Sequence, residues 1–253
     1  MQKKNLLRNA LIASSLFSAV TTANARNKYL FVYFSGNNPQ QEQIRYAVSD
    51  DGFNYAPLNG GNPVVSSDTI ARTGCVRDPH ILRTKKGEYL MVVTDMRSSL
   101  GWSSNRGMVL LKSRDLIHWQ HHTIHFPEKY AGTNFANVTR VWAPQTIYDE
   151  KADKYMVYFS LLTNDGTIPY DRVYWAYANA DFSDLEGEPQ VLFDFKAPAI
   201  DTDIVQDKKG EYHLFFKTEQ EGAHKGIRQY VFRDLHNPSS WTLLDGFCEQ
   251  TKD

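Results

Sequence analysis

The clearest pattern of hydrophobic and polar positions lies between residues 76 and 94. Two apolar segments, Val76–Arg83 and Tyr89–Thr94, are joined there by a polar turn. The second segment is rich in aromatic and β-branched residues, and a glycine-containing turn separates the two, so the pair predicts a β-hairpin. The first segment carries an acid directly before a proline, Asp78-Pro79. The pattern therefore predicts a hairpin whose first strand presents a carboxylate.

The start of the second strand recurs along the chain as a charged residue, a tyrosine and then apolar residues. The four tyrosines lie 60, 66 and 57 residues apart (29 to 89, 89 to 155, 155 to 212). Another strand-like run follows each tyrosine, at Arg45–Asp50, Val109–Asp115, Trp175–Asp181 and Gln229–Asp234. Repeats of about 40–60 residues that contain several short strands are typical of β-propeller blades. The sequence thus predicts an all-β propeller, with a β-sandwich of accidentally similar strands as the alternative.

The composition is consistent with one large all-β domain. The chain has 253 residues, of which 42% are hydrophobic and 13% aromatic, which is enough for a sizeable core. The net charge is −1 with no long run of one sign, so nothing points to a nucleic acid partner or to an anionic membrane surface. The aromatic content suits core packing and sugar stacking equally.

Residues 1–25 have the features of a secretory signal peptide. They contain a basic start, a short apolar core and a small-x-small cleavage pattern: Lys3, Lys4 and Arg8, then Ala10–Val20, then Ala23-Asn24-Ala25. The apolar core is too short to span a bilayer stably, and no cysteine follows it closely. We therefore expect cleavage after Ala25, secretion or export to the periplasm, and no membrane anchor. A buried N-terminal strand is the alternative.

The propeller domain then occupies residues 26–253, and its first repeat is incomplete. No inner strand precedes the tyrosine anchor at Tyr29, and closed propellers complete such a blade with strands from both chain ends. No further anchor follows Tyr212. We expect three full repeats and one partial repeat, in a domain truncated at its C-terminus. A complete smaller domain, open or four-bladed, is the alternative.

Cys75 and Cys248 are the only two cysteines. An exported chain permits a disulfide, but two cysteines do not make a disulfide framework. Because each follows the outer region of a different repeat, we expect two free, buried thiols rather than a bridge.

Candidate catalytic carboxylates come from the inner strands. Asp78 lies 11 residues before Tyr89, and Asp201 lies 11 residues before Tyr212. In the middle repeat, which has one more turn residue, Ala143 takes the same place. Because inner strands line a propeller's channel, both acids should face it from non-adjacent blades, as glycoside hydrolysis by two carboxylates requires. The alternatives are a turn-capping role for Asp78 and a loop position for Asp201.

Further polar candidates follow on the same strands. His80, Gln145 and Asp203 lie two residues beyond the acid register and face the same way, so we expect them to contact substrate. For His80 the alternatives are a channel cation and a hydrogen-bonded core position. Glu219 ends a strand and is either a substrate contact or a solvated loop acid. The histidines around Trp119 lack the spacing of a zinc site, so we expect no metal site there.

At these motifs the sequence resembles the family 43 glycoside hydrolases, over about residues 28–253. The resemblance is carried, in chain order, by Arg77-Asp78-Pro79-His80-Ile81, Lys112-Ser113-Arg114-Asp115-Leu116 with Trp119, Val141-Trp142-Ala143-Pro144, and Ile200-Asp201 followed by Gly210-Glu211-Tyr212. It implies a five-bladed propeller and an inverting enzyme. With the export predicted above, we expect a secreted or periplasmic enzyme that is a monomer. Its carbohydrate substrates would be plant-type glycans containing arabinose, xylose or galactose. No cofactor is implied, and a structural calcium ion in the channel is left open.

By motif, the resemblance gives Asp78 the role of the general base that deprotonates the attacking water. It gives Asp201 the role of the carboxylate that raises the pKa of the general acid and orients it. Trp142 lies in the motif near the sugar-binding centre. The sequence departs from the family at Gln145, where many members have an acid, so substrate contacts there should differ.

The general acid is the larger departure. The family has a Glu-Gly on the next inner strand, and none follows Trp241. Glu249 is near the right place without the glycine, and Glu186-Gly187 lies in the wrong blade, so we expect the acid beyond Asp253. Two rival functions remain: a non-catalytic carbohydrate-binding propeller, and a retaining relative of the β-fructosidases, against which the missing upstream Asn-Asp-Pro motif counts.

Overall fold

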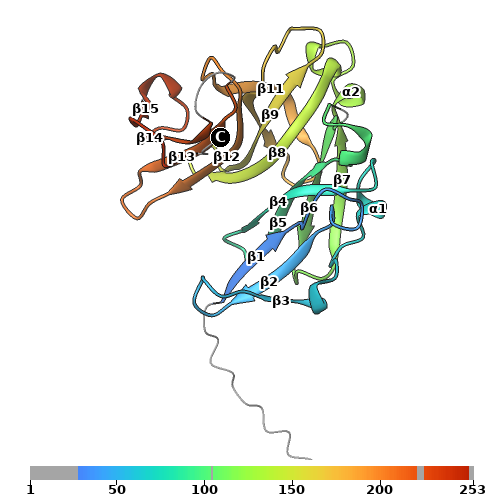
Figure 1. The fold of residues 1–253 in the computed structure, drawn as a ribbon. Coiled ribbons are helices and arrows are strands. Elements are labelled where there is room, and N and C mark those ends of the chain that lie inside the picture. Colours follow the sequence, from blue (N-terminus) through green and yellow to red (C-terminus); the bar gives the residue numbers. More distant parts are fainter. Residues whose placement is uncertain (1–27, 104, 221–224, 251–253) are drawn as a thin grey trace, which may run out of the picture.

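The computed structural model describes residues 28–103, 105–220 and 225–250, and the signal peptide predicted at residues 1–25 lies outside them. The described strands form four antiparallel sheets, each built from strands that are consecutive in the chain (Figure 1). The first sheet consists of β1 (Tyr29–Tyr33), β2 (Arg45–Ser49) and β3 (Ala56–Pro57). The second consists of β4 (Val76–Arg83), β5 (Tyr89–Asp95), β6 (Gly107–Ser113) and β7 (Trp119–His125).

The remaining strands complete two more sheets. The third sheet consists of β8 (Val138–Asp149), β9 (Lys154–Thr163), β10 (Arg172–Ala178) and β11 (Leu185–Phe193). The fourth consists of β12 (Ala199–Gln206), β13 (Tyr212–Thr218), β14 (Gly226–Phe232) and β15 (Thr242–Leu243), and β16 (Glu249–Gln250) also pairs with β14. The strand starts at all four tyrosine anchors confirm the predicted repeat.

The helices of the described residues are single turns in the connections between strands. The α-helical turns are α1 (Ser67–Ile70) and α2 (Phe126–Lys129), and the 3-10 turns are η1 (Asn59–Gly61), η2 (Ser98–Leu100), η3 (Asn134–Asn137) and η4 (Pro238–Ser240). In the described part of the chain, none of these helices has the length and apolar character that a bilayer crossing needs.

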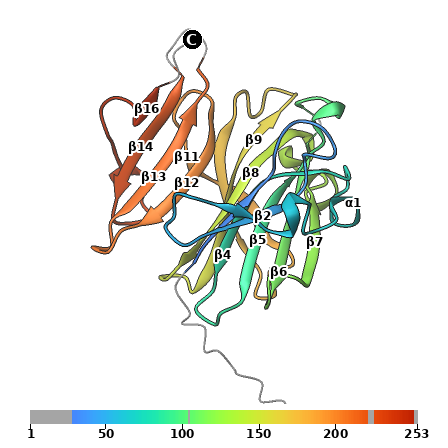
Figure 2. The same ribbon diagram turned by 60° about the horizontal axis from the view of Figure 1, so that its bottom comes forward.

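The four sheets follow one another around an arc, which Figures 1 and 2 show from two directions. Strands β4, β8 and β12 are the inner edges of their sheets, and β8 contacts both β4 and β12. This radial order is that of a propeller rather than a sandwich. Within the described residues, the first sheet has no corresponding inner strand, and β1 is its edge strand. The described residues therefore contain three full repeats and one partial repeat, as predicted.

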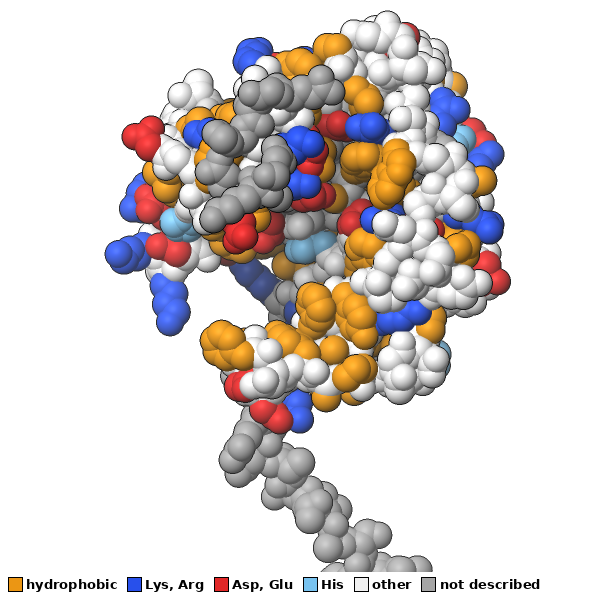
Figure 3. Space-filling view, in the orientation of Figure 1, with side chains coloured by type: hydrophobic (Ala, Val, Ile, Leu, Met, Phe, Trp, Pro, Cys, Tyr) orange, Lys and Arg blue, Asp and Glu red, His pale blue; other side chains and the backbone are white. Residues whose placement is uncertain are grey.

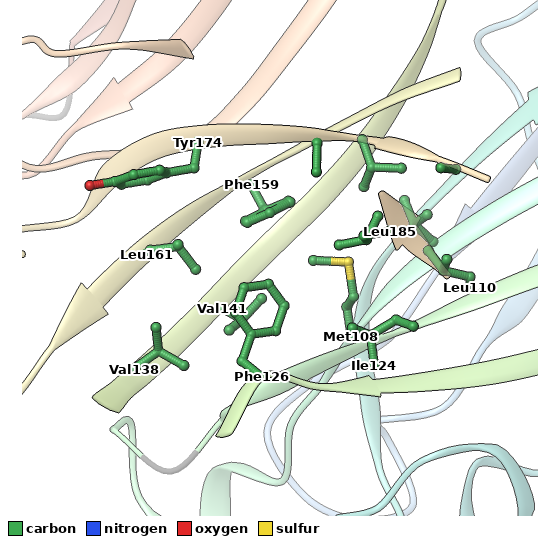
Figure 4. Packing of buried hydrophobic residues seen from close by; sticks show 14 of the residues in the cluster. Met108, Leu110, Ile124, Phe126, Val138, Val141, Phe159, Leu161, Tyr174 and Leu185 are labelled. Atoms are coloured by element: carbon green, nitrogen blue, oxygen red, sulfur yellow. The ribbon is translucent and has the colours of Figure 1, made fainter. Parts of the chain in front are cut away.

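Apolar side chains fill the spaces between neighbouring sheets. Between the second and third sheets, Met108, Phe126, Val141 and Phe159 belong to one buried cluster (Figure 4). Two further clusters join the first sheet to the second and the third to the fourth. Full burial of such a side chain contributes about 1.5–3 kcal/mol, so packing between sheets stabilises the arc and fixes the inner strands against one another.

Both cysteines are free. Cys75 is buried just before β4, but Cys248 is exposed, so the expectation of two free thiols is confirmed and the expected burial of Cys248 is wrong. Cys248 lies in the surface segment between β15 and β16, where its backbone N–H donates to the carbonyl oxygen of Ile227 at 2.8 Å. That pairing fixes the backbone at the edge of the sheet and leaves the thiol in contact with solvent.

Candidate active site

Each of the three inner strands contains a bulge at the same place. The pairing register shifts within Arg77–His80 of β4, Trp142–Gln145 of β8 and Ile200–Asp203 of β12. The residue inside each bulge has a left-handed backbone: φ is 50° at Asp78, 45° at Ala143 and 52° at Asp201. Aspartate tolerates this conformation better than most residues, whereas for alanine it costs about 1–2 kcal/mol. The shared conformation places these three residues in one register, as their spacing predicted.

A single hydroxyl connects Asp78 to the next sheet. The fully buried Thr94, on β5, donates a hydrogen bond from Oγ1 to Asp78 Oδ2 at 2.9 Å. The same Oγ1 accepts the backbone N–H of Ala143 at 2.9 Å. The position of the carboxylate is therefore tied to the bulge of β8.

Both candidate carboxyl groups have raised pKa values. Burial raises the pKa of Asp78 to about 6, and the negative charge of Asp201 acts in the same direction against the Thr94 hydrogen bond and the Arg77 charge. Desolvation also raises the pKa of Asp201, with Lys217 and Arg77 opposing it. The charge of Asp201 acts on Asp78 although the third sheet separates their sheets, so the two groups share one electrostatic environment.

A second layer of polar residues, His80, Gln145 and Asp203, lies two positions beyond the bulge residues Asp78, Ala143 and Asp201. His80 Nδ1 accepts the backbone N–H of Thr146 at 3.2 Å, and burial lowers the pKa of His80 to about 4. The ring is therefore neutral near pH 7, with its proton on Nε2. The hydroxyl of Tyr158 donates to Gln145 Oε1 at 3.2 Å and accepts the N–H of Ile204 at 3.0 Å. His80 thus joins the second sheet to the third and Tyr158 joins the third to the fourth, whereas Gln145 pairs with Tyr158 within the third sheet.

A cavity of about 630 Å³ opens beside this second layer. Its lining includes His80, Gln145 and Asp203, and the rest comes mainly from the C-terminal halves of the inner strands and the turns that follow them. Asp78 and Asp201 do not line it. Acidic side chains and a histidine gather in the hollow on the concave side of the arc (Figure 3). The predicted site residues therefore form two layers, with the carboxylates of the bulges above the cavity.

Aromatic and cationic side chains surround the carboxylate layer. Trp142 lies edge-on to Trp102, with 6.3 Å between ring centroids, and the guanidinium of Arg140 is 4.3 Å from the Trp142 ring centroid. The guanidinium of Arg77 is 5.3 Å from the ring centroid of Trp102, whose side chain is 49% exposed. An exposed indole face suits stacking against a sugar ring. Trp102 was not predicted as a site residue, because it lies in a connection between β5 and β6 that has no periodic pattern.

Glu219 is held by two lysines rather than standing free in solvent. It directly follows β13 and forms ion pairs with Lys217 and, at 3.6 Å, with Lys225. Burial alone would raise the pKa of Glu219, but these ion pairs outweigh it and lower the pKa. Its negative charge also acts on Asp201, so Glu219 belongs to the surroundings of the candidate site.

Among the described residues, one group brings three potential metal ligands together: Asp207, Glu211 and His213 at the β12–β13 hairpin. The Asp207 carboxylate accepts the backbone N–H groups of Lys209 and Glu211, each at 2.8 Å. These hydrogen bonds account for Asp207 as a turn residue. The group lies at the end of β12 remote from its bulge.

Comparison with known proteins agrees with this architecture. Residues 24–253 match the model of a family described as a probable glycosyl hydrolase domain, related to family 43. The chain belongs to this glycosyl hydrolase family. An α-L-arabinofuranosidase of Bifidobacterium longum subsp. longum is 30% identical to this family member over 207 residues, which are 74% of the chain and 19% of the relative. The chain thus spans about a fifth of the length of that curated relative.

Solved structures share the fold at low sequence identity. An α-L-arabinofuranosidase from Lactobacillus brevis matches with a TM-score of 0.61 and 14% identity, covering 87% of this glycosyl hydrolase chain and 69% of its own. An endo-1,4-β-xylanase from Bacteroides thetaiotaomicron matches with a TM-score of 0.60 and 13% identity, covering 88% and 70%. At such identities the likeness establishes the fold, and the two names differ in substrate.

Proposed function

We propose that this protein is a secreted glycosidase that hydrolyses O-glycosidic bonds in glycans containing arabinose, xylose or galactose, with inversion at the anomeric carbon. The observation that carries the proposal is the placement of Asp78 and Asp201 in identical bulges of non-adjacent inner strands. The charge of Asp201 acts on Asp78, so the two groups share one electrostatic environment. A pair of such carboxyl groups is the usual requirement for glycoside hydrolysis.

Asp78 is the general base in this proposal. Its pKa of about 6 leaves it ionised at neutral pH, and a base with a pKa near the working pH removes a proton from water efficiently. The water attacks the anomeric carbon, its proton passes to an Asp78 oxygen, and the leaving oxygen takes a proton from a general acid on the opposite face. Asp201 holds that acid and, by its negative charge, raises its pKa.

Substrate contacts fall to the residues around these two carboxylates. Trp142 lies beside the exposed Trp102, and their edge-on arrangement presents indole surfaces to a sugar. Gln145, His80 and Asp203 line the cavity below and supply hydrogen-bonding groups to the buried part of the substrate. Glu219, fixed by its lysine partners, contacts hydroxyl groups beside Asp201.

A further sheet completes the site in this proposal. Tyr29 and Phe31, on one face of β1, are 54% and 50% exposed, and Val205 and Ile227 at the opposite end of the arc are 46% and 37% exposed. Apolar strand faces of this kind are normally covered by another sheet. One more sheet of the same protein, closing a five-bladed ring, would bury both faces and bring the general acid opposite Asp78.

The N-terminal pattern at residues 1–25 supports export of the protein. Edman sequencing of protein recovered from the periplasm or the medium should begin at Arg26. Recovery of an intact Met1 in the exported fraction would contradict cleavage after Ala25.

Hydrolysis of nitrophenyl α-L-arabinofuranoside, β-D-xyloside and β-D-galactoside by the purified protein, with its full coding sequence, tests the function. We expect at least one to be cleaved, and proton NMR should show the inverted anomer first. Asp78→Asn should lower kcat by about 10²–10⁴-fold, the usual contribution of a general base.

The matched control is Asp153→Asn. Asp153 has the same left-handed conformation, with φ at 56°, but it lies in the turn between β8 and β9, so its substitution should leave kcat unchanged. Retention of configuration would point instead to a β-fructosidase-like mechanism. Glycan binding without turnover of any substrate would favour the non-catalytic propeller.

A further inference from the structure

A carboxylate from the first sheet's side of the arc lies buried next to the candidate site. Glu42, in the connection between β1 and β2, has no exposed surface. Its Oε1 accepts the backbone N–H of Ser98 at 3.0 Å and a hydrogen bond from Arg77 Nη1 at 3.1 Å. A fully buried carboxylate is costly to maintain unless it is paired and hydrogen-bonded, and both conditions are met by groups of the second sheet's region.

The partner of Glu42 is the residue directly before Asp78. The guanidinium of Arg77 lies between two rings, 4.4 Å from the centroid of Phe34 and 5.3 Å from that of Trp102. Its Nη1 also donates to Asn37 Oδ1 at 2.7 Å. Two aromatic faces and two oxygen acceptors leave this cation little freedom, so its charge has a fixed position beside the bulge of β4.

The loop that carries Glu42 is rigidly built. The backbone N–H of Val76 donates to the carbonyl oxygen of Glu42 at 3.0 Å, which anchors the loop to the start of β4. The buried Arg45 donates only to backbone carbonyl oxygens, namely those of Gln40, Gln41, Gln43 and Gly61. Because no carboxylate pairs with Arg45 among the described residues, Glu42 remains available to Arg77.

We propose that Glu42 is a positioning residue, which fixes the Arg77 guanidinium between Phe34 and Trp102 and sets how much positive charge reaches Asp78 and Asp201. The first sheet, which contributes neither candidate carboxylate, thereby controls the charge state of both through this ion pair. The inference rests on the proposed function for its catalytic meaning, but the charge coupling itself does not depend on any reaction.

The charged groups around the two acids determine in which direction each substitution should shift the pKa of Asp78. Asp78 is faced by Arg77 from its own strand, by Glu42 from the β1–β2 loop and by Asp201 from β12. Asp201 is in turn influenced by Lys217 and Glu219 from β13 and by Arg77. A positive charge beside Asp78 favours its ionised form, and a negative charge disfavours it. Glutamine at position 42 removes the negative charge, but its amide oxygen can still accept the hydrogen bonds from Arg77 and Ser98. Glu42→Gln and Arg77→Gln should therefore shift the pKa of Asp78 in opposite directions.

The experiment is a pH titration of Asp78 in the intact protein by NMR of carbon-13-labelled aspartate carboxyl groups, with the Asp78 signal assigned by its absence in Asp78→Asn. Arg77→Gln should raise the titration midpoint by about one pH unit, and Glu42→Gln should lower it by about half a unit, since the Glu42 charge acts on Asp78 more weakly than the Arg77 charge does. Arg77→Lys keeps the charge and should leave the midpoint within about 0.3 units of the wild-type value.

The control is Glu128→Gln, which removes a carboxylate from its 2.6 Å ion pair with Arg72 at the periphery and should not move the Asp78 midpoint. Shifts of the same sign in Glu42→Gln and Arg77→Gln, or no shift in either, would overturn the proposal. If Glu42→Gln does not fold, Glu42→Asp keeps the charge but shortens its reach to Arg77; the Asp78 midpoint should then rise, and an unchanged midpoint would overturn the proposal. Because no substrate is used, the result is independent of whether the glycosides are cleaved.

Discussion

The substitution Asp78→Asn should make the folded protein more stable at pH 8 and leave its stability almost unchanged at pH 4. The ordinary pKa of 3.8 is raised to about 6 by burial and by the charge of Asp201. One pKa unit corresponds to about 1.4 kcal/mol, so ionising Asp78 costs the folded state up to about 3 kcal/mol. Asparagine avoids this cost, tolerates the left-handed backbone, and can still accept the hydrogen bond from Thr94.

The direction in which the stability gain of Asp78→Asn changes with pH follows from proton linkage. A group whose pKa is higher in the folded state binds its proton more tightly there, so its contribution to stability is full below pH 3.8 and is lost as pH rises through about 6. The difference between variant and wild type should therefore grow between pH 4 and pH 6 and be constant above pH 7. Partial access of solvent to the side chain reduces the plateau to about 1–3 kcal/mol.

The assay is urea unfolding, followed by tryptophan fluorescence, at a series of pH values from 4 to 8. For a domain of this size, 1 kcal/mol corresponds to about 2–4 °C in Tm, so calorimetry should show the same trend. Asp153→Asn, in the turn between β8 and β9, serves as the control and should show no such pH-dependent gain. A variant less stable than wild type at pH 8, or a difference that does not vary with pH, would refute the electrostatic reasoning.

Three further outcomes are expected. The acid limb of kcat/KM should have its midpoint near pH 6, with activity lost as Asp78 is protonated below it; a profile flat down to pH 4.5 would exclude Asp78 as the base. Ala143→Gly should raise the free energy of unfolding by about 0.5–1 kcal/mol, because glycine adopts the left-handed φ without strain, and a loss measured by urea unfolding would contradict this. Tyr158→Phe should destabilise the protein by about 1–3 kcal/mol, since the buried N–H of Ile204 loses its acceptor; calorimetry showing an unchanged Tm would contradict that role.

The repeat, the inner strands and the shared register of Asp78 and Asp201 were predictable, because strand period and tyrosine spacing are local properties of the sequence. The left-handed conformation at these positions was not, since the register shift depends on pairing with the neighbouring strand. The same holds for Glu42, which lies far along the chain from Arg77. Its only sequence signal is an acid in a loop, and only the packing of two sheets brings it to the arginine.

The three bulges also bear on how such a protein changes its chemistry. The backbone forms the same left-handed bulge in three sheets, with an aspartate in two of them and an alanine in the third. Ala143 shows that this bulge forms without a carboxylate. Strand pairing and packing between the sheets stabilise it. Reactive groups can therefore be gained or lost at these positions by single substitutions, while the architecture that orients them is inherited unchanged.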